Sequence, residues 1–138
     1  MSLETRGRLR KRGEKKMITL NWAGYKIIDE DSIKKLPQFA GVYKLSTYFT
    51  ASEKYKPFYV GQADNIYNRT IQHVGESEKN SCIKENFKKY AIYINYAEVK
   101  LQSDRDSVEI ALYNNYKTSC NDENALPNVR PSEVSSFN

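Results

Sequence analysis

Two tyrosines lie in short segments that mirror each other in sequence, Gly41-Val42-Tyr43 and Tyr59-Val60-Gly61. An arginine and a histidine follow at a spacing of four, which places two side chains on one face of a helix. A glutamate and an asparagine come later in the chain. Phenol, guanidinium, imidazole and carboxylate groups can together bind an anion or a metal ion and move protons. The candidate site residues are Tyr43, Tyr59, Arg69, His73, Glu109 and Asn121.

Taken singly, each of these residues has an ordinary structural explanation. The chain holds eleven tyrosines, so a tyrosine in a strand is usually there for packing. An arginine on an amphipathic helix is usually solvated, and a glutamate near a helix N-terminus is favoured by the helix dipole. An asparagine just after a helix is commonly a turn or cap residue. Only the whole set, with its order and spacing, indicates a function.

The ordered set resembles the GIY-YIG nuclease superfamily, with valine in place of isoleucine in both name-giving tripeptides. The run from Tyr59 to Arg69 is similar to the family's YVGxAxDLxxR pattern. His73 falls where many homing and restriction members place a histidine. The stretch from Glu109 to Asn121 is similar to the family's E-(x)11-N ending. The resemblance covers most of the part of the chain that we expect to fold.

The chain departs from the family pattern in three places. Its two motif tyrosines are sixteen residues apart, farther than in compact members, and the extra residues fall in the polar stretch Ser46–Lys56. We therefore expect a longer loop there and an undisturbed sheet. Gln62 stands where the excision-repair incision subunit often has lysine, which together with His73 favours the homing or restriction-like branch. Thr118 replaces a proline that often follows Tyr-Lys in the family.

The resemblance implies a metal-dependent endonuclease that hydrolyses DNA phosphodiester bonds. The implied cofactor is Mg²⁺ or Mn²⁺ with Glu109 as its ligand, because magnesium accepts one carboxylate together with phosphate oxygens and waters. Arg69 would contact the scissile phosphate through its planar fork of donors.

The family pattern also implies roles for the other site residues. Tyr43 would be the general base, although a phenol with a pKa of about 10 is a poor base at neutral pH. It therefore needs nearby positive charge or hydrogen bonds, from Arg69, the metal or His73. Tyr59 would hydrogen-bond the nucleophile or the phosphate. Asn121 would orient the site rather than transfer protons.

The elements around these residues favour a small α+β domain, with a mainly antiparallel three-stranded sheet flanked by helices in the order β-β-α-α-β-α. Asp64 is the expected N-cap of the helix that carries Arg69 and His73, and Gly75 is its expected end. Asp31 or Ser32, and later Asp104 or Asp106, are expected to cap two other helices. The predicted elements are a short strand or packing segment at 17–22, a short helix at 32–36, strands at 41–45 and 57–61, helices at 65–74 and 82–89, a strand at 91–100 and a helix at 107–117.

Length and composition exclude several classes of protein. A chain of 138 residues fits one domain, and 39% hydrophobic with 28% charged residues is globular composition. No apolar run is long enough to span a membrane, and no secretory signal is present. Two cysteines are too few for a disulfide scaffold, and without CxxC spacing they do not fit a zinc site. We therefore expect an intracellular, cytoplasmic protein associated with nucleic acid.

The net charge of +5 belongs to an N-terminal arm, because residues 17–138 hold equal numbers of basic and acidic side chains. Residues 1–16 have little apolar surface and are expected to be a disordered arm. A single domain at 17–138 follows, with a loop-rich tail from about 119. Such an arm suits a polyphosphate backbone, but it also fits a solubilising tail or a cloning remnant. The predicted nucleic-acid-binding residues are Arg6, Arg8, Arg10, Lys11, Arg12, Lys15, Lys16 and Arg69.

Two other functions stay open. The first is a non-catalytic or partner-dependent nucleic-acid-binding module on the same fold, which the neutral charge of the domain favours. The second is a protein-interaction domain, which would show no phosphate-driven salt dependence in a DNA titration. The expected partner is double-stranded DNA, with no membrane contact. Sequence preference, biological role and oligomeric state, a dimer included, are left open.

Overall fold

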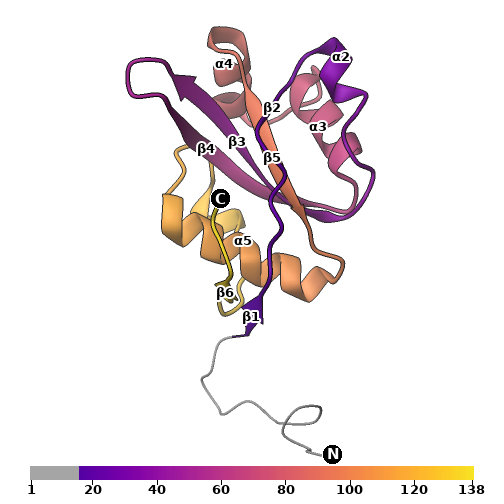
Figure 1. Cartoon of the computed structure of the whole chain (residues 1–138), viewed down its shortest axis with the longest axis vertical. Helices are drawn as coiled ribbons and strands as arrows, with labels where there is room; N and C mark the ends of the chain where they lie inside the picture. Colours follow the sequence, from indigo (N-terminus) through magenta and orange to yellow (C-terminus); the bar gives the residue numbers. More distant parts are fainter. Residues whose placement is uncertain (1–15) are drawn as a thin grey trace, which may run out of the picture.

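A four-stranded sheet in the order β2-β5-β3-β4 forms the centre of the structure (Figure 1). The computed structural model describes residues 16–138. The strands are β2 (Lys26–Ile27), β3 (Gly41–Phe49), β4 (Lys54–Ala63) and β5 (Tyr93–Glu98). All three pairings within the sheet are antiparallel. The predicted α+β class is confirmed, and the sheet has one strand more than expected, the two-residue β2.

Helices cover both faces of this sheet (Figure 1). One face carries α2 (Glu30–Ile33), α3 (Ile66–Val74) and α4 (Ser81–Lys89). The other face carries α5 (Gln102–Tyr116). Beside α5, β1 (Met17–Ile18) pairs in parallel with β6 (Glu133–Val134), and the 3₁₀ turn η1 (Glu123–Ala125) precedes β6. No helix among residues 16–138 is long and apolar enough to cross a membrane.

Alternation along β3 divides the core into two layers, because successive side chains of a strand point to opposite faces. Tyr43 and Leu45 pack into the layer with Ile66 of α3. Val42 packs into the layer with Leu112 of α5. The alternation therefore sends the first motif tyrosine toward α3.

The stretch Ser46–Lys56 is not the long loop that the sequence suggested. Both strands continue into it, and a tight turn at 50–53 joins them. Tyr48 pairs with Tyr55 across the two strands, and aromatic residues favour this position in a sheet. Glu53 completes the turn with a φ of 54°. The extra residues therefore lengthen a hairpin.

The helix that carries the arginine and histidine begins one residue later than predicted. Asn65 is its N-cap, and its side chain accepts a hydrogen bond from the Asn68 N–H. Asp64, the predicted cap, instead accepts from the Arg105 guanidinium at 2.9 Å. The predicted end at Gly75 is confirmed.

The other predicted caps are wrong as well. Asp29 caps α2, in place of Asp31 or Ser32. The last helix begins at Gln102, without a side-chain cap, so both predicted cap residues lie within its first turns.

Most of the predicted basic arm lies outside the described residues. Lys16 is described, and its Nζ lies 2.6 Å from a carboxylate oxygen of Asp104. The arm residues outside the described part are Arg6, Arg8, Arg10, Lys11, Arg12 and Lys15.

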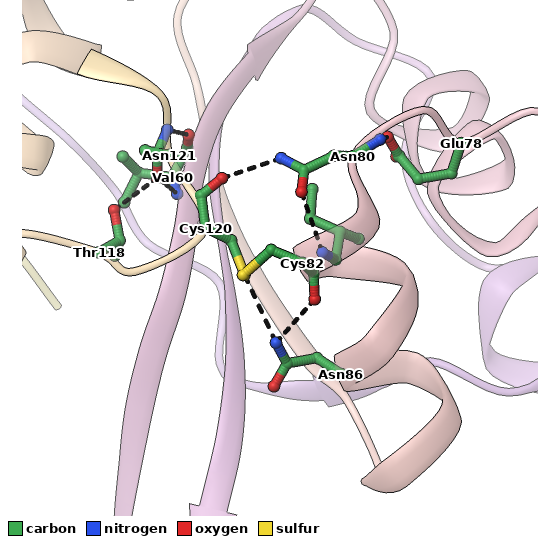
Figure 2. Close-up of a disulfide and its surroundings, with 9 residues drawn as sticks. Val60, Glu78, Asn80, Cys82, Asn86, Thr118, Cys120 and Asn121 are labelled. Atoms are coloured by element: carbon green, nitrogen blue, oxygen red, sulfur yellow. Dashed lines mark hydrogen bonds between the residues drawn. A yellow bond between two sulfur atoms is a disulfide. The ribbon is translucent and has the colours of Figure 1, made fainter.

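A disulfide joins Cys82 of α4 to Cys120, which follows α5 (Figure 2). The two Cα atoms are 5.3 Å apart, and 38 positions separate the cysteines in sequence. The sequence analysis did not predict this pairing. It ties α4 to the segment that follows α5.

Loss of the Cys82–Cys120 bond is expected to lower the free energy of unfolding by about 2–4 kcal/mol, because the bond restricts the unfolded chain. Urea denaturation of the oxidised protein and of the Cys82→Ser/Cys120→Ser variant measures this difference. A reductant should lower the midpoint of the wild type and leave the variant unchanged. Equal midpoints for the oxidised wild type and the variant would contradict the prediction.

Candidate active site

Three buried side chains from separate segments form a hydrogen-bonded chain on the α3 face of the sheet. The hydroxyl oxygen of Tyr43, on β3, lies 2.6 Å from Nε2 of His73, in the last turn of α3. The other ring nitrogen, Nδ1, contacts a carboxylate oxygen of Glu78, in the loop between α3 and α4. Tyr43 and His73 are each 1% exposed, and Glu78 is 9% exposed. Both ring nitrogens therefore have partners, which fixes the orientation of the imidazole.

The protonation states follow from burial. Burial lowers the pKa of His73, and the positive charge of Arg69 acts in the same direction, while Glu78 opposes it. Burial also raises the pKa of Tyr43 well above 10, and Arg69 opposes this rise. The resting pair at neutral pH is therefore a neutral phenol beside a neutral imidazole. Tyr43 can act as a base only if its own proton moves to an acceptor, and Nε2 of His73 is in contact with it.

Tyr59 and Arg69 complete this side of the site. The Tyr59 ring lies 5.5 Å from the imidazole of His73 and 6.2 Å from the ring of Tyr43, between ring centres. Burial raises the pKa of Tyr59, and the charge of Arg69 lowers it. Arg69 is half-buried and donates a hydrogen bond to Gln72 at 2.8 Å. It borders a surface hollow that Glu78 also lines, so an anion can reach the guanidinium from solvent.

Gly61 is required by the packing of the Tyr43 phenol. The two residues are partners across β3 and β4. A Cβ atom on Gly61 would lie 2.6 Å from the Tyr43 hydroxyl oxygen and 2.9 Å from a ring carbon of Tyr59. The glycine of the second tripeptide therefore makes room for the tyrosine of the first.

Glu109 approaches the site from α5, on the opposite face of the sheet. It is 9% exposed, and burial raises its pKa, with the nearby Asp106 adding to the rise and Arg69 opposing it. The charge of Glu109 acts in turn on the phenols of Tyr43 and Tyr59. The carboxylate of Glu109 therefore interacts electrostatically with the phenols and the guanidinium, although α5 packs on the other face of the sheet.

The donor set at Glu109 fits a divalent cation that takes most of its ligands from water and substrate. Among residues 16–138, no three His, Cys, Asp or Glu side chains cluster to form a protein cage for a metal. Mg²⁺ usually keeps several waters and binds one or two carboxylates, so it does not need such a cage. The ion pairs of the described residues leave the buried Glu109 carboxylate without a cationic partner. A cation bound at Glu109 would supply the positive charge that balances this carboxylate.

Asn121 contacts the backbone of β4 rather than the centre of the site. Its Oδ1 accepts from the Val60 N–H and its Nδ2 donates to the Val60 carbonyl, both at 2.9 Å (Figure 2). Because β4 is an edge strand, this side of Val60 has no neighbouring strand. The asparagine takes the place of one and holds the middle residue of Tyr59-Val60-Gly61. The orienting role of Asn121 stays a prediction.

Sequence reasoning missed Glu78 and its support. The Asn80 N–H donates to the second carboxylate oxygen of Glu78 at 2.9 Å. Asn80 also caps α4 through the Ile83 N–H and donates to the Cys120 carbonyl at 2.9 Å (Figure 2). Glu78 lies in a polar loop that shows no periodic pattern. A carboxylate five positions after the only histidine was the one available signal.

Comparison with known proteins shows the fold of this chain. No family model and no curated protein matches it. The magnesium-bound GIY-YIG N-terminal endonuclease domain of UvrC from Thermotoga maritima matches with a TM-score of 0.51 and 21% identity, covering 69% of this chain and 100% of that one. A point mutant of that domain with its catalytic divalent cation gives a TM-score of 0.51 and 20% identity, covering 70% and 100%. The chain therefore has the GIY-YIG fold, which confirms the fold implied by the tripeptides.

Gly61→Ala is expected to lower the free energy of unfolding by about 1–3 kcal/mol, because the new methyl group overlaps the Tyr43 phenol. Thermal or urea denaturation measures the change. Gly24→Ala is the matched control, because a Cβ there meets nothing within 4 Å; it should stay within about 0.5 kcal/mol of the wild type. Equal stabilities of the two variants would contradict the packing assigned to Gly61.

Proposed function

We propose that this chain is a metal-dependent endonuclease that hydrolyses phosphodiester bonds in double-stranded DNA. The buried hydrogen bond between Tyr43 and His73, next to Arg69, is the observation that carries this proposal. Apolar side chains would fill this part of the core equally well, and burying two polar groups is unfavourable unless they are hydrogen-bonded. A phenol held against a neutral imidazole is an arrangement for moving a proton.

The contacts of the residues support the following roles. The Arg69 guanidinium binds the scissile phosphate, since it is reachable from the surface and offers paired donors. Tyr43 takes a proton from the attacking water as its own proton moves to Nε2 of His73. Tyr59 hydrogen-bonds the water or the phosphate. Asn121 holds the strand that carries Tyr59.

Glu109 is the residue that would hold Mg²⁺ or Mn²⁺. The bound cation supplies positive charge against the negative charge that develops on the phosphate and the leaving oxygen. The water oxygen forms the new bond to phosphorus, the ester bond breaks, and solvent returns a proton to the leaving oxygen.

His73 also bears on the branch of the superfamily. Because its ring is buried and bonded on both nitrogens, it is part of the site rather than a surface residue. The solved structures described above are of the UvrC domain, so the homing or restriction-like branch rests on His73 and Gln62 in the sequence.

A nucleic-acid-binding module without catalysis is the second candidate. The charge pattern favours it, because residues 17–138 have no net charge and Lys16 is already paired with Asp104. Salt-dependent DNA binding without metal-dependent cleavage would identify this function.

Glu109→Gln is expected to slow metal-dependent nicking of supercoiled plasmid by at least about 100-fold, because it removes the charged oxygen ligand while keeping the shape of the side chain. Wild-type protein with Mg²⁺ should nick the plasmid, and EDTA should stop it. Glu85→Gln on the exposed side of α4 is the control and should match the wild type. Circular dichroism checks that each variant is folded.

Arg69→Ala should cause a loss of similar size through weaker phosphate binding and charge compensation. Rapid metal-dependent nicking by Glu109→Gln would overturn the metal-ligand role. Rapid nicking by Arg69→Ala would overturn the phosphate contact.

A further inference from the structure

We propose that Glu78 is a positioning residue of this site, whose carboxylate holds His73 in the tautomer that can accept the Tyr43 proton. Its part in the reaction rests on the function proposed above. The tautomer itself is a property of the folded chain and can be measured without any cleavage.

The hydrogen-bond geometry defines the tautomer. A neutral imidazole has one N–H donor and one acceptor nitrogen. Burial opposes ionisation of Glu78, but the bonds from Asn80 and His73 lower its pKa, so it is a carboxylate that can only accept. Nδ1 must then carry the hydrogen, and Nε2 is left to accept from the Tyr43 hydroxyl at 2.6 Å. The other tautomer would set an imidazole lone pair against the carboxylate.

Glu78 is held in place independently of the histidine. One carboxylate oxygen accepts from the Asn80 N–H at 2.9 Å, which leaves the other for His73. Asn80 is itself anchored to the cap of α4 and to the Cys120 carbonyl beside the disulfide (Figure 2). The α4 cap uses the side chain of Asn80, so it needs no carboxylate at position 78. The fold therefore presents a fixed carboxylate to the ring, which is how supporting residues tune a site.

The same contact stabilises the ring once it has accepted the proton. A water O–H bond breaks and a Tyr43 O–H bond forms, while the original Tyr43 proton moves to Nε2. The ring becomes a cation in a buried site, and the Glu78 carboxylate lies against its Nδ1–H. Glu78 gains no proton. This division of roles is the one that the carboxylate has in a Ser-His-Asp triad.

The positive charges near the ring oppose the imidazolium. Arg69 lowers the pKa of His73, and two lysines of α4 border the hollow beside the ring. Glu78 is the carboxylate in direct contact with the ring. The titratable and charged groups around His73 are Tyr43 of β3, Tyr59 of β4, Arg69 of α3, Glu76 and Glu78 of the loop, and Lys84 and Lys88 of α4.

The tautomer is directly measurable because the chain contains one histidine. Long-range ¹H–¹⁵N NMR of the wild type at pH 7.5 should show a protonated Nδ1 and an unprotonated Nε2. Glu78→Gln should shift the ring toward the Nε2–H form, whereas the exposed neighbour variant Glu76→Gln should not. A wild-type ring in the Nε2–H form, or a folded Glu78→Gln variant with an unchanged ring, would overturn the proposal. The wild-type spectrum decides even if Glu78→Gln does not fold.

Kinetics test the role in the reaction. Glu78→Gln should lower kcat for metal-dependent nicking at least tenfold with KM unchanged. Removing the carboxylate lowers the pKa of His73, and the reaction uses the neutral ring. The acid limb of the variant's pH–rate profile should therefore move to lower pH. A loss of rate that is equal at every pH would indicate a structural role and overturn the proposal. If the wild type does not cleave DNA, the proposed function fails, and the NMR result still decides whether Glu78 sets the state of His73.

Discussion

Burial of the Tyr43 hydroxyl against His73 is the constraint on which the rest of the site depends. A phenol inside a core must find a hydrogen-bond partner, and the imidazole of α3 provides it at 2.6 Å. Gly61 lacks a side chain because the phenol lies over it. The ring needs a second partner on Nδ1, and Glu78 supplies it. The two tripeptides and the helix that follows them therefore pack together around the Tyr43 phenol.

The site is assembled from both faces of the sheet around the edge strand β4. Tyr43, Tyr59, Arg69 and His73 belong to the α3 side, and Glu109 reaches them from α5. Asn121 fastens this edge by binding the backbone of Val60. The Cys82–Cys120 bond joins the segment that carries Asn121 to α4, next to the anchor of Glu78 (Figure 2). The disulfide therefore connects the segment that holds β4 to the helix whose cap residue, Asn80, holds Glu78.

The sequence predicted those features that local chemistry determines. The spacing of Arg69 and His73 predicted that they share a helix face, and Gly75 predicted the end of that helix. The tripeptides predicted an antiparallel pair of strands. It did not predict features that arise from contacts distant in the chain. Glu78 and Cys120 lie in loops without periodicity, and β2 is too short to leave a pattern. Cys82 lies in a predicted helix, but nothing near it in the sequence points to Cys120 as its partner. Asp64 is a good cap by type, but Arg105, 41 positions away, binds it instead.

A crystal structure of the protein with Mn²⁺ and a short DNA duplex tests the central claim most directly, because anomalous scattering locates the metal. Our account predicts a metal peak at the Glu109 carboxylate and a backbone phosphate on Arg69, next to the Tyr43 and Tyr59 hydroxyls. A metal bound away from Glu109, together with a DNA backbone that makes no contact with Arg69, would contradict it.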